Sequence, residues 1–186
     1  MNFTNIVTIL WLISEILLNV SRRAVPDQNK NTDERTLGMI WIVLMFAIAG
    51  GVLLAHSTHA PIFPDTNSAH TIGATVIIFG MLVRFAAILQ LGKFFTVDVS
   101  IRHGHEIVQK GLYRVIRHPS YTGALLSFIG FGVVQDNWFS FVVIFIPVLL
   151  AMLKRIAVEE RALIAHFGEA YEAYRKKTWR LIPFLY

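Results

Sequence analysis

The sequence predicts an all-α, polytopic membrane protein with about five transmembrane helices. Hydrophobic residues make up 55% of its 186 residues and charged residues only 16%, a balance that is unusual for a soluble domain. The apolar residues also gather in long blocks that reach or approach the roughly 20 residues needed to cross a bilayer. Lys and Arg are almost confined to the segments outside these blocks. Together these features predict a chain built around membrane spans.

The apolar blocks predict the spans in order along a single membrane-embedded domain, residues 1–186. The last block is interrupted by Gln135-Asp136-Asn137 and is therefore expected to form two spans joined by a tight turn. The first block has no basic leader and precedes Arg22 and Arg23, so it is expected to be a retained span, not a signal peptide. The predicted spans are residues 3–20, 37–55, 71–91, 119–135 and 138–153.

The distribution of positive charge predicts the orientation. Sixteen of the 17 Lys and Arg follow the first, third or fifth span, and segments 56–70 and 135–137 contain none. Cytoplasmic loops of membrane proteins carry an excess of Lys and Arg. We therefore expect the region after span 3 and the C-terminal tail to share the cytoplasmic side. Topology and anionic lipid headgroups explain the net charge of +5 better than nucleic-acid binding does.

Two ionisable residues lie well inside the first three predicted spans. Glu15 in span 1 and Arg84 in span 3 should both sit roughly 10 Å below the cytoplasmic boundary, at 1.5 Å of rise per residue. Charges in lipid are costly and usually face a partner or a cavity. Equal depth therefore predicts a Glu15–Arg84 pair, with either a structural role or a role in lining a path for a charged lipid headgroup.

The segment between spans 2 and 3 contains three histidines and one aspartate. A metal site is a weak alternative there, because the segment holds two prolines and no histidine pair at helical spacing. The chain has no cysteine, which excludes disulfides, thiolate catalysis and cysteine metal ligands. We expect an ordinary interfacial loop and no metal site; the residues concerned are His56, His59, Asp65 and His70.

The chemically richest segment is residues 102–121, a basic and aromatic block between long apolar runs. The residue before a proline avoids helical angles, whereas proline fits the first helical turn. His118 is therefore expected at the cap of a helix that begins at Pro119. Such a helix end presents free N–H groups and partial positive charge, which suits an anion.

A second pattern follows span 5. Five residues at helical spacing form one stripe if Gly168 merely bends the helix. They are Glu159, Leu163, Phe167, Tyr171 and Tyr174. A carboxylate at the head of a buried stripe requires a cationic partner. The pattern leaves open an ion pair with Lys154 or Arg155, or binding of the amino group or ribose of a cofactor.

A set of short motifs follows span 3. They are His105-Glu106-Ile107-Val108, Gly111-Leu112-Tyr113, Arg117-His118-Pro119-Ser120-Tyr121-Thr122-Gly123, Glu159-Glu160, and Phe167-Gly168 followed by Tyr171 and Tyr174. Together these motifs resemble the isoprenylcysteine carboxyl methyltransferase family of integral membrane enzymes. The resemblance covers about residues 92–183, the expected catalytic region. It implies methyl transfer from S-adenosylmethionine to the carboxylate of an isoprenylcysteine or a similar lipidic acceptor.

The resemblance also implies roles for individual residues. Arg155 matches the family's substrate-side arginine. The family's enzyme that acts on prenylated proteins has an amide residue near the position of Asp98, whereas this chain has an acid there. A smaller membrane-dissolved acceptor is therefore as consistent with the sequence as a prenylated protein is. Cofactor contacts carry over to His105, Glu106, Ile107, Val108, Tyr113, His118, Pro119, Ser120, Tyr121 and Glu159.

Three other functions share individual features of this sequence. An amine-directed phospholipid methyltransferase would share the cofactor site and differ in its acceptor. A sterol-type reductase has a similar His-Pro-x-Tyr segment and would use NADPH, but the His105–Val108 segment and the paired glutamates argue against it. A small carrier or scaffold would have polar residues spread through its spans or internal repeats, and the sequence has neither.

Overall fold

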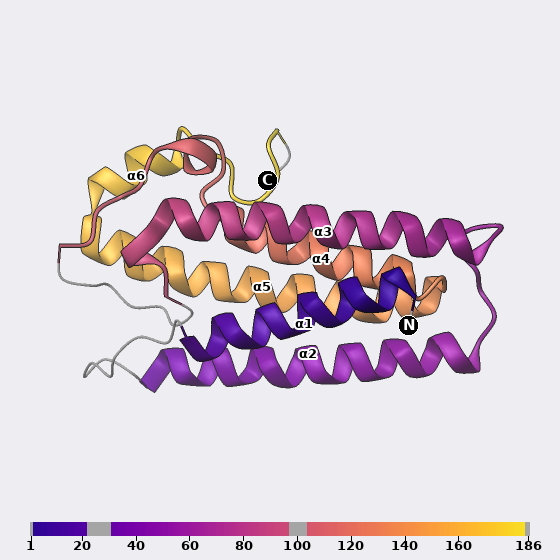
Figure 1. Cartoon of the computed structure of the whole chain (residues 1–186). Coiled ribbons are helices and arrows are strands. Elements are labelled where there is room, and N and C mark those ends of the chain that lie inside the picture. Colours follow the sequence, from indigo (N-terminus) through magenta and orange to yellow (C-terminus); the bar gives the residue numbers. More distant parts are fainter. Residues whose placement is uncertain (1, 22–30, 97–103, 185–186) are drawn as a thin grey trace.

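The protein is a bundle of long helices with a smaller helical unit at one end (Figure 1). The computed structural model describes residues 2–21, 31–96 and 104–184, with side chains from residue 38 onward in the second range. No strand occurs in these ranges, apart from an isolated bridge between Ile116 and Trp179. The helices are α1 (Phe3–Ser21), α2 (Asn31–Ser57), α3 (Thr66–Leu91), α4 (Pro119–Val134), α5 (Trp138–Phe167) and α6 (Glu169–Arg175), with single 3-10 turns at Gly92–Phe94 and Gly111–Arg114.

The predicted spans correspond to α1 to α5 in order. Four of these helices, α1, α2, α3 and α5, are long and apolar enough to cross a membrane, so the chain is a multi-pass membrane protein. Helix α4 is apolar but has only 16 residues, or about 24 Å of helix, which falls short of a hydrocarbon core of about 30 Å. A fifth complete crossing therefore stays a prediction. The helix that contains the last predicted span extends beyond residue 153, since α5 continues to Phe167.

Helices α3 and α4 pack backbone to backbone. A methyl group built on Gly80 would come 2.6 Å from the carbonyl oxygen of Gly123, and one on Gly123 would come 2.5 Å from the backbone nitrogen of Arg84. Small residues let membrane helices approach this closely. Gly123, Ser127 and Gly130 of α4 meet Gly80 and Gly73 of α3 across this interface.

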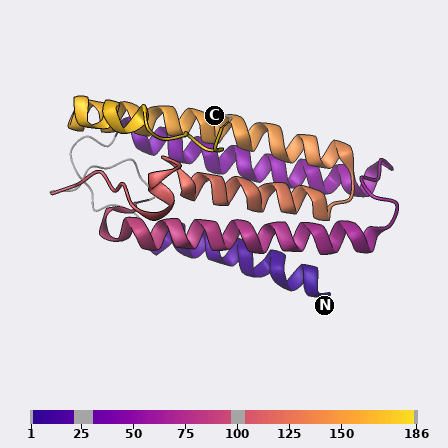
Figure 2. The same ribbon diagram turned by 90° about the horizontal axis from the view of Figure 1, so that it is seen from above.

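The other helices pack around this pair. Figures 1 and 2 together show α1 beside α3, and α2 beside α5. Trp11 of α1 is fully buried and meets Phe128 of α4 edge to face, with ring centroids 4.9 Å apart. The opposite face of α1 exposes large apolar side chains such as Leu10 and Leu17. In a membrane protein these exposed side chains face lipid.

Hydrogen bonds close one end of the bundle. The Asp136 carboxylate accepts from the backbone N–H groups of Ile62 and Phe63, each at 3.1 Å. Asn137 caps α5 by accepting from the Ser140 N–H at 3.1 Å, and its amide group donates to the Thr58 carbonyl oxygen at 3.1 Å.

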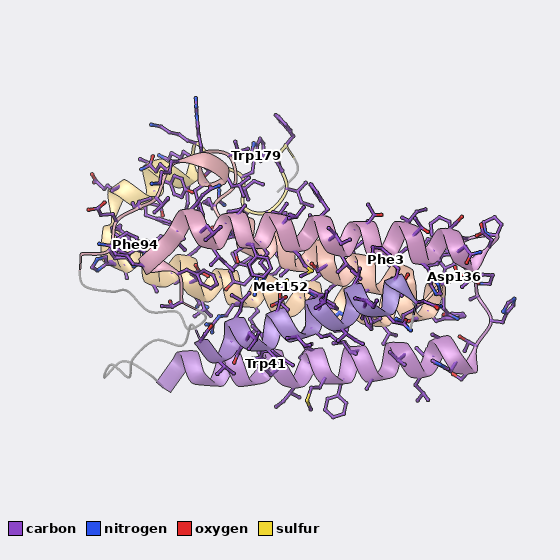
Figure 3. All side chains as sticks on the ribbon, in the orientation of Figure 1. Phe3, Trp41, Phe94, Asp136, Met152 and Trp179 are labelled. Atoms are coloured by element: carbon purple, nitrogen blue, oxygen red, sulfur yellow. The ribbon has the colours of Figure 1, made fainter. Side chains whose placement is uncertain are left out.

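The polar block lies at the other end. Figure 3 shows Asp136 and Phe94 at opposite ends of the bundle, with Trp179 on the side of α6. The chain bends at Gly168, the condition on which the predicted stripe from Glu159 to Tyr174 depends. Gly168 adopts a φ of 54°, a conformation that favours glycine, and it ends α5 before α6 begins. After this bend α6 lies beside the turn at Gly111–Arg114, to which Tyr174 of α6 is hydrogen-bonded.

Candidate active site

The N-terminus of α4 has the predicted form. Pro119 is in the first turn and His118 is the cap residue, with φ −123° and ψ 57°. The His118 ring is buried between two neighbouring carboxylates of α5. Its Nε2 lies 3.3 Å from Glu160 Oε1 and its Nδ1 lies 3.9 Å from Glu159 Oε1. The cap histidine therefore links the start of α4 to both glutamates.

Glu160 is the centre of a closed ion cluster. It is only 4% exposed. One carboxylate oxygen accepts from Arg117 Nε at 2.9 Å and the other from Arg180 Nη2 at 2.9 Å. With His118 as a third neighbour, the carboxylate is fully engaged by protein groups. A buried charge that is paired and hydrogen-bonded in this way is a structural element.

The same cluster fastens the C-terminal tail to the start of α4. Arg117 N–H donates to the Trp179 carbonyl oxygen at 2.7 Å, and Trp179 N–H donates to the Val115 carbonyl oxygen at 2.9 Å. The Thr122 hydroxyl adds a bond to the Leu181 carbonyl oxygen at 2.8 Å. The Arg117 guanidinium also donates to tail carbonyl oxygens, including that of Thr178. The tail is thus part of the wall that supports the site.

Glu159 has different surroundings. Its side chain is 31% exposed and faces a cavity, and one oxygen accepts from the Tyr121 hydroxyl at 2.9 Å. Arg155 lies one helical turn earlier on α5, is 2% exposed, and interacts with the same hydroxyl. Tyr121 therefore joins an arginine and a carboxylate that line one cavity.

The turn at residues 111–114 places Tyr113 in the cavity wall. Gly111 has a φ of 57°, and a side chain there would collide with Gln90, whose amide oxygen accepts the Leu112 N–H at 2.7 Å. The Tyr113 carbonyl oxygen accepts from the Tyr174 hydroxyl at 2.7 Å. Burial raises the pKa of Tyr113 well above its usual range, and the Glu159 charge adds to the rise. Burial also raises the pKa of Tyr174 to about 12, so both phenols stay neutral near pH 7.

A cavity of about 310 Å³ collects nearly all the residues predicted from the sequence. Pro119 does not line it and is instead fully buried in the first turn of α4. Asp98 lies outside the described residues. The predicted residues that line the cavity are His105, Glu106, Ile107, Val108, Tyr113, His118, Ser120, Tyr121, Arg155 and Glu159.

The cavity has a polar end and an apolar arm. His105 is at the polar end, where its ring stacks on Phe94 with centroids 4.7 Å apart and meets Phe167 edge on. The apolar arm is lined by α1 and α2, which sequence reasoning treated only as spans. Its wall includes Trp11, Leu12, Ile16, Trp41, Leu44 and Ile48.

The predicted Glu15–Arg84 pair is confirmed, and it also lines the cavity. Arg84 Nη2 donates to Glu15 Oε2 at 2.8 Å, and Arg84 Nε lies 2.7 Å from Glu15 Oε1. Arg84 Nη1 donates to the Ser120 carbonyl oxygen at 3.1 Å. The pair therefore ties α1 and α3 to the first turn of α4, directly beneath His118 and Tyr121.

The alternative metal site has other contacts. Asp65 caps α3, where it accepts from the Ser68 N–H at 2.8 Å, and the Ser68 hydrogen bonds lower the pKa of its carboxyl group. His56 Nδ1 lies 2.8 Å from the Val52 carbonyl oxygen. Within residues 2–21, 31–96 and 104–184, no group of three His, Cys, Asp or Glu is arranged to hold a metal ion.

Sequence reasoning missed several parts of this site. Gln90, which holds the turn at residue 111, is an ordinary polar residue near a helix end, with no motif to mark it. Glu160 was noted only as the neighbour of Glu159. Trp11 and Trp41 look like membrane-span aromatics, and only the folded arrangement brings them to the cavity.

Comparisons with known proteins identify relatives of this chain. The model of the isoprenylcysteine carboxyl methyltransferase (ICMT) family matches residues 72–165. A probable protein-S-isoprenylcysteine O-methyltransferase of Oryza sativa subsp. indica is 32% identical over 138 residues, which cover 72% of each chain. Protein-S-isoprenylcysteine O-methyltransferase A of Arabidopsis thaliana is 30% identical over 180 residues, which cover 94% of this chain and 91% of the relative.

A solved structure is similar as well. The structure of the eukaryotic intramembrane Ras methyltransferase ICMT superposes with a TM-score of 0.63 at 26% identity. The match covers 80% of this chain and 53% of that one. The chain thus shares the fold of the solved enzyme over a little more than half of its length.

Proposed function

The chain belongs to the isoprenylcysteine carboxyl methyltransferase family, and on that premise we propose that it transfers a methyl group from S-adenosylmethionine to the carboxylate of an isoprenylcysteine or a similar lipidic acceptor. One observation carries the proposal. A single cavity joins Arg155 and Glu159 at its polar end to an apolar arm between membrane helices. A water-soluble methyl donor and a lipidic acceptor require both surroundings within reach of each other.

The polar end has groups that suit S-adenosylmethionine. Glu159 presents a carboxylate with 31% side-chain exposure to the cavity, where it can receive an amino group or ribose hydroxyls. The first turn of α4 has backbone N–H groups without intrahelical acceptors, which suit a carboxylate of the donor. Tyr113 and Tyr121 offer aromatic faces to a cationic sulfur. His105 to Val108 and His118 line the same end.

S-adenosylmethionine, when bound, supplies a methyl group on a cationic sulfur, from which an in-line displacement can take it. The acceptor carboxylate has a free pKa near about 3.5, so it is ionised at neutral pH and needs no general base. The protein therefore has to orient the acceptor and exclude water. Arg155 is the group that we assign to this task, because a guanidinium can hold a carboxylate with two parallel hydrogen bonds.

The Tyr121 hydroxyl gives the two halves of the site a common support. It donates to Glu159 and interacts with Arg155, which are one helical turn apart. We assign Tyr121 the role of aligning both side chains, in addition to any contact with the donor. Alignment of this kind contributes to rate, since displacement requires the reacting atoms to be near 3 Å and in line.

We also propose that the polar end of the cavity faces the cytoplasm. The segments that build it are rich in Lys and Arg, whereas segments 56–70 and 135–137 at the opposite end carry none. The chain then works as one membrane-embedded domain, with its catalytic region in residues 92–183. The bilayer itself would deliver the lipidic acceptor to the apolar arm.

The test is titration calorimetry of detergent-purified protein with S-adenosylhomocysteine, with NADPH as the parallel ligand. We expect S-adenosylhomocysteine to bind wild-type protein and to lose at least tenfold in affinity in Glu159→Gln, about 1.4 kcal/mol. Glu169→Gln, which changes an exposed glutamate of α6, should bind like wild type. Binding of NADPH but not of S-adenosylhomocysteine would contradict the methyltransferase function and indicate a reductase.

Turnover identifies the acceptor. Wild-type protein should methylate S-farnesylcysteine derivatives that carry a free carboxylate, and should leave the amine of phosphatidylethanolamine unmodified. Methylation of the phospholipid alone would reassign the chain to amine methylation, with the donor site unchanged.

A further inference from the structure

Helix α1 supplies polar groups to the cavity although it lies outside residues 72–165, the part that matches the family model. Trp11, Glu15 and Asn19 follow one another at helical spacing of four residues, and all three line the cavity. Glu15 is paired with Arg84. Polar groups inside a membrane helix are costly and tend to be functional. A row of them on the cavity-facing side of a helix whose other side exposes large apolar residues therefore points to a ligand.

Trp11 is the unusual member of this row. It is fully buried, and its indole Nε1 has no hydrogen-bond acceptor within the described part of the chain. A buried tryptophan N–H usually finds a partner, because leaving a buried donor unpaired is unfavourable. Since Trp11 lines the cavity, a bound molecule can provide the missing acceptor.

Given the proposed function, the position of Trp11 indicates which atom of the methyl acceptor would lie next to its indole. Trp11 and Met152 belong to one buried cluster, and Met152 precedes Arg155 by three residues, about 4.5 Å of helix rise. In an S-prenylcysteine the thioether sulfur lies roughly 4 Å from the carboxyl carbon, across three single bonds. It is also the first heteroatom on the hydrocarbon side of that carboxylate.

The walls around Trp11 suit sulfur. Phe128 meets the indole edge to face at 4.9 Å and Phe131 lies 5.6 Å from it, centroid to centroid. Thioether sulfur makes favourable contacts with aromatic rings and is a weak hydrogen-bond acceptor. We propose that Trp11, supported by Phe128, forms a thioether subsite in which the indole N–H donates to the sulfur of the acceptor. This inference rests on the proposed methyltransferase function and deepens it.

The test compares two acceptors that differ in one atom, S-farnesylcysteine and its analogue with CH₂ in place of sulfur. We expect wild-type kcat/KM to favour the thioether about tenfold, the combined effect of a weak hydrogen bond and sulfur–aromatic contact. In Trp11→Phe the ratio should fall to about twofold. Trp41→Phe, which removes an indole from the α2 wall, should keep the wild-type ratio. A ratio measured within one variant is insensitive to how much of that variant is folded.

A spectroscopic measurement on the unaltered chain guards against a Trp11 variant that does not fold. In protein with ¹⁵N-labelled indoles, the thioether ligand should shift one of the four tryptophan N–H signals, and the CH₂ analogue should not. Equal methylation of both acceptors, or equal shifts, would overturn the subsite and leave the methyltransferase function standing. Failure to methylate either acceptor would overturn the function and the subsite together.

Discussion

Glu159 and Glu160 are neighbours on α5, yet they belong to two regions with different tasks. Successive residues of a helix point about 100° apart, so one carboxylate turns toward the tail and the other toward the cavity. Glu160 is 4% exposed and meets Arg117, His118 and Arg180. Glu159 meets the neutral hydroxyl of Tyr121 and keeps a face open to the cavity. The contrast shows that the surroundings of a carboxylate, more than its presence in a motif, separate a structural charge from one that can receive a ligand.

The largest effect is expected on stability, from a change in the buried ion cluster around Glu160. Glu160→Ala leaves the Arg117 and Arg180 charges without their carboxylate, and breaking a buried pair in this way costs about 3 kcal/mol. We expect a marked fall in the thermal unfolding temperature in detergent. Glu172→Ala removes a carboxylate from a more exposed pair and should change stability little. Equal unfolding temperatures of Glu160→Ala and Glu172→Ala would contradict a structural role for Glu160.

On the cavity side, Arg155→Lys should affect turnover more than stability. Lysine keeps the charge but loses the two-pronged geometry that orients a carboxylate. We expect kcat/KM for the acceptor to fall about 100-fold, or about 2.7 kcal/mol, with S-adenosylhomocysteine affinity nearly unchanged. An equal loss of both would place Arg155 in the donor site. Arg161→Lys, at an exposed position on the same helix, is the matched control.

Glu15 is an intermediate case, because it lines the cavity and is also held by a cation. If Glu15 and Arg84 act as a pair, the effects of Glu15→Gln and Arg84→Gln on the free energy of unfolding should not add. We expect a coupling energy of about 1.5 kcal/mol from a double-mutant cycle. Additive losses would show that the 2.7 Å contact contributes no stability.

The smallest effect is expected from removing a single tyrosine hydroxyl, and it separates residues that support ligand binding from residues that support stability. Tyr121→Phe removes one hydroxyl that donates to Glu159, a loss of about 1 kcal/mol of net hydrogen bonding. We expect a decrease of about fivefold in affinity for S-adenosylhomocysteine and in kcat/KM for the acceptor. Tyr174→Phe, which removes a hydroxyl from the structural side, should lower stability by a similar amount and leave ligand affinity nearly intact.

The helices were predictable because their signals are local. Length and apolar composition predicted the spans, and the proline at residue 119 predicted both the start of α4 and the cap position of His118. The Glu15–Arg84 pair followed from equal depth in the membrane. The stripe from Glu159 to Tyr174 allowed for a bend at Gly168 but did not predict that α5 ends there, because the apolar pattern continues across it. Glycine at a positive φ stops the helix there, whatever the pattern of its neighbours.

The separate roles of Glu159 and Glu160 could not be predicted, because their partners are remote in the sequence. The contact between Glu160 and Arg180 requires the tail to turn back after α6, and that of Arg117 requires α4 and α5 to meet at one level. The apolar arm depends in the same way on α1 and α2 packing on different neighbours. Local periodicity carries no information on such long-range contacts.

The most direct test of the contrast between Glu159 and Glu160 is thermal unfolding of Glu159→Gln and Glu160→Gln, each with and without S-adenosylhomocysteine. A ligand that binds the folded state raises the unfolding temperature. We expect Glu159→Gln without ligand to unfold at the wild-type temperature, and S-adenosylhomocysteine to cause no increase in that temperature. We expect Glu160→Gln without ligand to unfold at a lower temperature than wild type, and S-adenosylhomocysteine still to increase it. The reverse result, with the rise lost in Glu160→Gln and kept in Glu159→Gln, would contradict the account.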